Sequence, residues 1–191
     1  MTVAETIQPP FLVTPLPGKG MSVIATAPIP IDTLLFSELP LLLLLDESHS
    51  TPLQTRVLAA FNKLPPKPRA GLLSLCSNLD QGKKHTDEAI ALGVWKANNF
   101  CLDSEGTVNG IFELAARLNH ACIGGENCRW EWDPETREMA FYTVRDIEEG
   151  EELTHCYRPD WRMGTKNRRE ALMEEYGFFC GCTTCESPEE D

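Results

Sequence analysis

Three cysteines crowd the C-terminal end of this 191-residue chain, and they constrain its fold more than any other feature. Cys180, Cys182 and Cys185 lie in the segment FFCGCTTC, where Gly181 relieves crowding between the first two. Three thiolates at this spacing can wrap around one metal ion, whereas a structural zinc site takes four ligands in a tetrahedron. The alternative, a set of free surface thiols, leaves this clustering unexplained. The fourth ligand must come from elsewhere in the fold, from a partner chain, or from a nearby carboxylate such as Glu186.

Composition narrows the class of protein before the remaining motifs are considered. Seventeen basic residues against 29 acidic ones give a formal charge of −12, which argues against a general nucleic-acid-binding protein with a basic face. An acidic surface could attract a basic peptide, although the ordinary acidity of many protein surfaces explains the charge equally well. The segment MTVAETIQPPF has no charged region followed by an apolar one, so no secretory signal is expected. We therefore expect an intracellular protein, nuclear or cytoplasmic, whose clustered cysteines bind metal rather than form disulfides.

The spacing of apolar residues divides the chain into β-rich and helical stretches. Extended signals run over 11–45, spacings of three and four favour helices over 51–98, and β signals return after Phe100. The segment TKNRREALMEEY at 165–176 predicts a last short helix. The apolar run TLLFSELPLLLLL at 33–45 is too short for a membrane helix, which needs roughly 18 or more apolar residues. We expect this run to form a buried strand.

Three further motifs combine residues that could hold a ligand, although each is weak by itself. In RLNHACIGGENC, Asn119 and His120 are adjacent polar residues, and Cys122 follows two positions later. In GEELTHCY, an acidic turn leads into a strand that is expected to end at Tyr157. In PGKGMSVIA, two glycines let backbone amides approach a ligand closely. A structural histidine, a core tyrosine and an ordinary hairpin turn are the plain alternatives, so it is the order of the motifs that is informative.

With NNF before the Asn-His motif and EEYGFFCGCTTC after the tyrosine, these motifs make the chain resemble a SET-domain lysine methyltransferase. It looks most like the SMYD-type and fungal SET proteins, and the similarity runs from about Leu12 to Cys185. The resemblance implies a mostly β fold with a helical insert (α+β), built of small sheets as in the SET β-clip. The SET domain would cover 1–176 with the insert at about 47–98, and 177–191 would form a post-SET cysteine tail.

The resemblance also implies roles for individual residues. Tyr157 would be the catalytic residue beside the transferring methyl group, and Cys122 would join the three tail cysteines around one structural zinc. Contacts to S-adenosylmethionine would come from Gly18, Lys19, Gly20, Asn98, Asn119, His120, Tyr157 and Phe178. The substrate would be a protein or peptide bearing a lysine, with no direct contact to nucleic acid or to a membrane.

Two features depart from the family pattern. The family motif Asn-His-x-Cys usually continues x-Pro-Asn, whereas this loop is two residues longer, lacks the proline and reaches Asn127 as the counterpart of the second Asn. The insert holds no second zinc-binding cluster of the MYND type, because Cys76 is its only cysteine. Two alternatives to a protein methyltransferase stay open. One is a non-catalytic SET module that binds cofactor or a partner, and the other is a SET-fold enzyme acting on a small molecule.

Other polar and aromatic residues are given structural interpretations. Residues expected to pack in the interior rather than to react are His155, Cys156, Cys76, Cys101 and Cys128. Trp161 follows Tyr157 closely, and it is the tryptophan whose position best suits the lining of a substrate channel.

Overall fold

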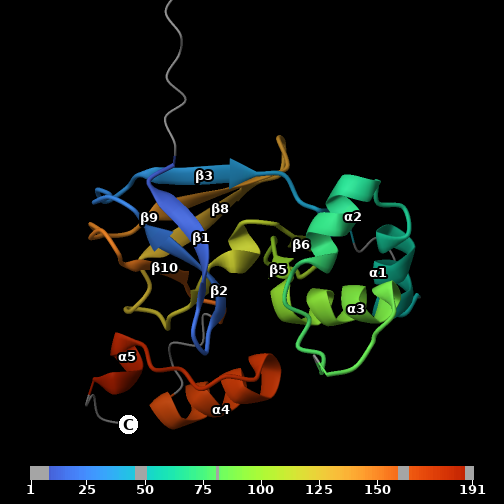
Figure 1. Cartoon of the computed structure of the whole chain (residues 1–191). Coiled ribbons are helices and arrows are strands. Elements are labelled where there is room, and N and C mark those ends of the chain that lie inside the picture. Colours follow the sequence, from blue (N-terminus) through green and yellow to red (C-terminus); the bar gives the residue numbers. More distant parts are fainter. Residues whose placement is uncertain (1–8, 46–50, 81, 159–163, 188–191) are drawn as a thin grey trace, which may run out of the picture.

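The computed structural model describes residues 9–45, 51–80, 82–158 and 164–187 and shows small sheets beside a separate group of helices (Figure 1). Its strands are β1 (Phe11–Leu16), β2 (Gly20–Ala25), β3 (Leu34–Glu38), β4 (Leu42–Leu45), β5 (Phe100–Cys101), β6 (Val108–Ile111), β7 (Asn119–His120), β8 (Cys128–Asp133), β9 (Glu138–Thr143) and β10 (Glu152–His155). Its helices are α1 (Leu53–Phe61), α2 (Pro66–Leu73), α3 (Asp87–Asn98), the 3-10 turn η1 (Ala115–Arg117), α4 (Thr165–Tyr176) and α5 (Thr183–Glu186). None of the described helices is long and apolar enough to span a membrane.

One four-stranded sheet joins the motifs that the sequence analysis singled out. Its order is β1-β2-β10-β7, with β2 antiparallel to both β1 and β10 and β7 parallel to β10. The parallel pair sets Thr154 opposite Asn119 and His155 opposite His120. Parallel strands need a long connection, and here the chain returns through β8 and β9 before β10 begins. The Asn-His motif and the strand before Tyr157 therefore lie side by side although they are more than 30 residues apart.

The apolar run that was expected to form one buried strand forms two strands in two different sheets. β3 pairs with β9, whereas β4 pairs with β6. Pro40 lies between them, and proline has no N–H to donate to a neighbouring strand, so the pairing stops there. The expectation of a single strand was wrong because hydropathy reports burial and does not report a change of sheet.

The helical insert has a core of its own against the β4 strand. Val57 and Phe61 are buried one turn apart on α1, and Val94 and Trp95 are buried on α3. These residues pack in one cluster with Leu42 of β4. Helix α3 begins where the Thr86 side chain accepts a hydrogen bond from the Ala89 amide, and the acidic residues of its first turn suit the positive end of the helix dipole.

The carboxylate of Glu38 anchors the segment that leads into the Asn-His motif. It accepts hydrogen bonds from the backbone amides of Glu113, Leu114 and Ala115, the last at 2.6 Å. These are amides at the start of η1, which no helical carbonyl can satisfy. Burial raises the pKa of Glu38, and the three amides oppose that rise. The end of β3 thereby fixes where η1 starts, and η1 ends two residues before Asn119.

The cysteines outside the tail were expected to be buried, and only part of that expectation holds. Cys128 is buried in the main core, where β8 pairs with β9. Cys76 and Cys101 are exposed instead. Cys76 lies beyond the end of α2, and Cys101 ends a two-residue strand, so neither is enclosed by regular structure.

Candidate active site and metal centre

Asn119 connects three parts of the four-stranded sheet. Its Nδ2 donates to the Ser22 hydroxyl at 2.6 Å and to the Glu152 carboxylate at 2.8 Å, and it lies 3.3 Å from the Met21 carbonyl. Glu152 also forms an ion pair with Lys19. Burial raises the pKa of Glu152, but the Lys19 ammonium and the Asn119 amide outweigh it and hold the pKa below its ordinary value. The carboxylate is therefore charged at neutral pH between two predicted cofactor-binding residues.

The turn between β1 and β2 brings its backbone close to this group. Gly18 and Gly20 have φ of 77° and 76°, in the left-handed region that favours glycine. The space where a side chain would stand at either position is open, so the backbone of this turn is accessible to a ligand. Lys19 between them reaches across to β10 through its ion pair with Glu152. The turn with the predicted residues Gly18, Lys19 and Gly20 is thus linked to Asn119 through the Glu152 carboxylate.

The His120 ring is held in one tautomer by its neighbours. The backbone N–H of Tyr157 donates to Nδ1 at 3.0 Å, so Nδ1 must be the acceptor and Nε2 must carry the proton. Nε2 lies 3.3 Å from the Cys122 sulfur and can therefore donate to it. This single side chain joins the backbone at Tyr157 to one of the predicted metal ligands.

Tyr157 lies in an aromatic group two residues beyond β10, which ends at His155 and not at the tyrosine as expected. Its hydroxyl donates to the Leu118 carbonyl at 2.9 Å. Burial, and then the neighbouring Tyr176, raise the pKa of this hydroxyl well above its ordinary value. The phenol is therefore neutral at physiological pH, and its oxygen keeps lone pairs that can accept a hydrogen bond.

Two aromatic residues from the end of α4 complete this group. The Tyr176 ring lies 5.1 Å from the Tyr157 ring, centroid to centroid, and the Phe178 ring lies 5.9 Å from that of His120. Phe178 was predicted as a wall for the cofactor, whereas Tyr176 was missed. The signal was present in EEYGFFC, where a second aromatic residue stands two positions before Phe178. Its meaning depends on how α4 packs.

His155 was expected to be a packing residue, and the structure buries it. Its ring stacks on Phe100 with centroids 5.4 Å apart and lies 4.9 Å from the Tyr157 ring. Burial lowers its pKa to about 3, with a smaller effect from His120, so the imidazole is neutral at physiological pH. His155 thus packs against the Tyr157 ring as a flat, uncharged side chain.

Four cysteine sulfurs form a candidate metal centre. The Sγ atoms of Cys122, Cys180, Cys182 and Cys185 all lie within 4.8 Å of one another. The Cys122 sulfur is 3.9 Å from that of Cys180 and 3.5 Å from that of Cys185. A tetrahedron of Zn–S bonds near 2.3 Å places its sulfurs about 3.8 Å apart. The donor set and its spacing therefore fit zinc.

The electrostatics of these thiols point in the same direction. The hydrogen bond between Cys122 and Cys180 raises the pKa of Cys122 and lowers that of Cys180 to about 3, because one thiol donates to the thiolate of the other. Close thiols must share protons in this way unless a cation compensates their charge. A divalent metal would hold all four as thiolates.

The lengthened loop after Cys122 fits closely under the tail. Gly125 approaches α5 so closely that a Cβ there would lie 2.9 Å from the Thr184 hydroxyl oxygen. Further along the loop, the Asn127 side chain accepts from the Thr154 amide at 2.7 Å and donates to the Glu152 carbonyl at 2.8 Å. The two extra residues thus leave Cys122 beside the tail cysteines and Asn127 tied to β10.

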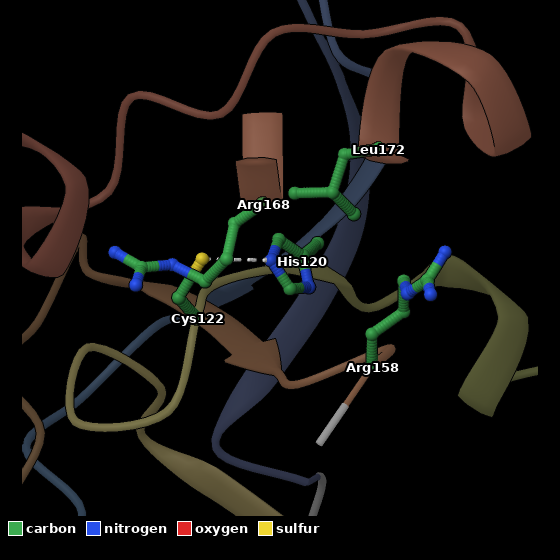
Figure 2. A pocket seen from close by; sticks show the side chains of 5 residues that line it. All are labelled: His120, Cys122, Arg158, Arg168 and Leu172. Atoms are coloured by element: carbon green, nitrogen blue, oxygen red, sulfur yellow. Dashed lines mark hydrogen bonds between the residues drawn. The ribbon is translucent and has the colours of Figure 1, made fainter. Parts of the chain in front are cut away.

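A small pocket lies between α4 and β7, the strand that carries His120, and Figure 2 shows it from close by. Leu172 and Arg168 enter it from α4, and the dashed line marks the His120–Cys122 interaction. Arg158 borders the pocket next to Tyr157 in the sequence. The pocket thus extends from His120 to the candidate metal centre.

The contacts described above do not include two of the residues predicted from the sequence. Asn98 ends α3, and its Nδ2 donates to the carbonyls of Cys76 at 2.7 Å and Val94 at 2.9 Å. Both amide hydrogens thus bind the helical insert, and its predicted cofactor contact stays a prediction. Trp161, the predicted channel residue, lies outside the described residues.

The chain was compared with models of known protein families, and one of them spans most of the motifs described above. The family model described as SET domain matches residues 20–158. The chain therefore belongs to the SET-domain family, and the expected α+β fold of small sheets with a helical insert is confirmed. The crystal structure of the SET domain of LSMT bound to lysine and AdoHcy superposes with a TM-score of 0.59 at 12% identity, covering 92% of this chain and 54% of that chain. This likeness supports the fold.

Curated relatives include histone-lysine N-methyltransferases. The protein set5 of Schizosaccharomyces pombe, which carries that name, is 31% identical over 182 residues, covering 92% of this chain and 50% of its own length. SMYD3 of Homo sapiens, which carries the same name, is 37% identical over 82 residues, covering 43% of this chain and 18% of its own length. The chain thus spans half of the first relative and a smaller part of the second.

Proposed function

We propose that this chain transfers a methyl group from S-adenosylmethionine to a lysine side chain of a protein or peptide. The observation that carries the proposal is the setting of Tyr157, a neutral, partly buried phenol where the Asn119–His120 strand meets the aromatic end of α4. Membership of the SET-domain family and the similarity to set5, a histone-lysine N-methyltransferase, support it.

The residues around Tyr157 fit the chemical groups of the cofactor. S-adenosylmethionine carries a carboxylate, an ammonium and a flat adenine. The Lys19 ammonium and the open backbone of the Gly18–Gly20 turn suit the carboxylate, and the Glu152 carboxylate with Asn119 suits the ammonium. The Phe178 ring beside His120 suits the adenine. Asn98 would contribute through its Oδ1, because its Nδ2 donates to two carbonyls.

The bound cofactor would supply a methyl group activated by a sulfonium sulfur. The protein must deliver a lysine amine in its neutral form, although an exposed lysine has a pKa near ~10.4. The rings of Tyr176, Phe178 and His155 pack around Tyr157, and an apolar environment beside it would disfavour the ammonium. The chain thereby favours loss of the amine proton before transfer.

Tyr157 would orient the amine for an in-line attack. Because its own hydrogen is directed to the Leu118 carbonyl, its oxygen can accept a hydrogen bond from the amine N–H. Its raised pKa keeps it from ionising as the pH rises, so it acts by position and not as a base. Positioning of this kind is a large part of the rate enhancement for a bimolecular displacement.

The metal would be structural. Zinc held by Cys122, Cys180, Cys182 and Cys185 would fix the tail segment that carries Phe178, without a part in the transfer. The end of α4 at Gly177, with φ of 79°, supports a division between a SET domain at 1–176 and a post-SET tail at 177–191. We further propose an intracellular location, nuclear or cytoplasmic, because the proposed substrates are found there.

A methyl-transfer assay tests the proposal. Zinc-loaded protein is incubated with radiolabelled S-adenosylmethionine and either core histones or a cell extract, beside the Tyr157→Phe variant. We expect labelled protein with the natural sequence and a fall on the order of 100-fold in Tyr157→Phe, because the amine loses its orienting partner. Cofactor binding measured by calorimetry should survive the substitution.

Tyr142→Phe is the matched control, because Tyr142 lies on β9 with its ring against Arg129. It should keep the rate of the natural protein. Equal rates for Tyr157→Phe and the natural protein would show that the assigned role of Tyr157 is wrong. Tight cofactor binding with no transfer to any protein would favour a non-catalytic module or a small-molecule enzyme.

A further inference from the structure

Arg169 on α4 holds the tail at two of the candidate zinc ligands. Its Nε donates to the Cys180 carbonyl at 2.8 Å, and its Nη2 donates to the Cys185 carbonyl at 3.1 Å. The guanidinium also lies 5.4 Å from the centre of the exposed Phe179 ring. One planar side chain thus holds both ends of the Cys180–Cys185 segment against the helix.

Arg168, its neighbour on α4, faces the sulfurs. Its Nη2 lies 3.9 Å from the Cys185 sulfur, and in Figure 2 its side chain lies beside that of Cys122. Four thiolates around one Zn²⁺ carry a net charge of −2. A cluster of that charge, with three of its four cysteines buried, needs compensation, and a nearby guanidinium provides it.

The same helix leads to the aromatic residues of the candidate active site. α4 ends at Tyr176, whose ring packs on Tyr157, and Phe178 follows after one glycine. Leu172, in the middle of α4, is buried with Cys122, Cys180 and Cys185 in one small cluster. A change in how α4 sits on the metal centre would therefore move Tyr176 and Phe178.

We propose that Arg169 and Arg168 form the outer shell of the zinc site and connect the metal to the aromatic wall of the cofactor pocket. Arg169 is a positioning residue that fixes the peptide carbonyls of two ligands, and Arg168 balances the charge of the thiolates. Groups that contact the ligands of a metal without binding the metal itself orient those ligands and tune the metal in this way. The first half of this proposal is independent of the enzymatic one, whereas the connection to the cofactor pocket rests on the proposed function.

The rate of zinc transfer from the folded protein to a chelating dye tests the first half. Arg169→Ala should release zinc about 10–100-fold faster, as is typical when an outer-shell partner is lost. Arg169→Lys keeps the charge but cannot donate to both carbonyls in the same way, so its rate of zinc release should lie between those of the natural protein and Arg169→Ala. Lys166→Ala is the control, since its exposed pair with Glu170 on the same helix should change the rate by no more than about twofold.

Release from Arg169→Ala at the rate of the natural protein would overturn the proposal. Should circular dichroism show that Arg169→Ala is unfolded, Arg168→Gln takes its place, because it removes the charge and keeps most of the side chain. It too should release zinc faster, and an unchanged rate would overturn the charge-balancing role.

Calorimetry with S-adenosylmethionine on the zinc-loaded variants tests the second half. Affinity should fall about 10-fold in Arg169→Ala and stay unchanged in Lys166→Ala. Faster zinc release with unchanged cofactor affinity would overturn the connection to the pocket. Absence of cofactor binding by the natural protein would refute the proposed function and with it this connection, while the zinc-transfer result would stand.

Discussion

Asn119 and His120 lie on a strand paired with β10, whereas Phe178 and the tail cysteines lie beyond α4, in a segment whose only helix among the described residues is the four-residue α5. We call the first region the sheet half of the site and the second the tail half. The sheet half rests on backbone hydrogen bonds and on a core that includes Val23, Phe141 and Leu153. The tail half rests on a small cluster in which Leu172 is joined by Cys122, Cys180 and Cys185.

The difference indicates when each half becomes ordered. Burial of large side chains stabilises the sheet half as soon as the domain folds. The cluster of the tail half is too small to fix it by hydrophobic burial alone, and its cysteines gain most from a bound metal. His120 joins the two halves, since it accepts from the Tyr157 amide and its ring lies 5.9 Å from that of Phe178. Zinc would thus complete a site whose other half forms without it.

Removal of zinc should show the largest difference between the two halves of the site. Chelation under reducing conditions should lower the affinity for S-adenosylmethionine by about 100-fold or more, because structural zinc contributes directly to the folding of the segment it holds. The circular dichroism of the sheets and their cooperative thermal unfolding should persist. A metal-free protein that binds the cofactor as tightly as the zinc-loaded one would contradict the comparison.

Replacement of one ligand should weaken zinc binding and leave the sheet half folded. Cys122→Ser should lower zinc affinity beyond the roughly 10–100-fold typical of outer-shell changes, since a direct ligand is lost. Cys128→Ser is the matched control, because Cys128 is a buried thiol that belongs to the sheet core. Competition with a zinc-binding dye measures both affinities. Tight, stoichiometric zinc in Cys122→Ser would indicate a different fourth ligand.

Acidification should reveal a property of the sheet half alone. His155 has a pKa of about 3 in the folded protein and near 6.5 when unfolded, so between these values only the unfolded chain takes up a proton. The free energy of unfolding should therefore decrease as the pH is lowered below about 6.5, by on the order of 1 kcal/mol per pH unit.

The His155→Phe variant isolates this effect. Its ring suits the aromatic surroundings, so it should fold, and its stability should depend less on pH. Urea unfolding of both proteins at pH 7, 6 and 5 makes the comparison, and acid release of zinc affects both alike. Parallel pH dependences would show that His155 does not carry the effect.

Sequence analysis reached the parts of this site that lie in short local motifs. The three tail cysteines lie within six residues of one another, and Asn119 directly precedes His120. The chemistry of each motif is therefore visible in the sequence. The residues alone left the fourth ligand open, and the family resemblance selected Cys122, which the structure brings to the tail. Glu152, Tyr176 and Arg169 were missed, because each takes its meaning from a partner distant in the chain.

By itself the sequence determined the family, the alternation of β-rich and helical stretches, and the capacity of the tail to bind a metal. Those properties follow from side-chain chemistry and from periodicities that span a few residues. Only the tertiary structure decided that Pro40 separates two sheets, that His120 bridges Tyr157 and Cys122, and that α4 carries both Arg169 and Tyr176. The reason is that these contacts depend on strand register and helix packing, which are fixed by the burial of residues throughout the chain.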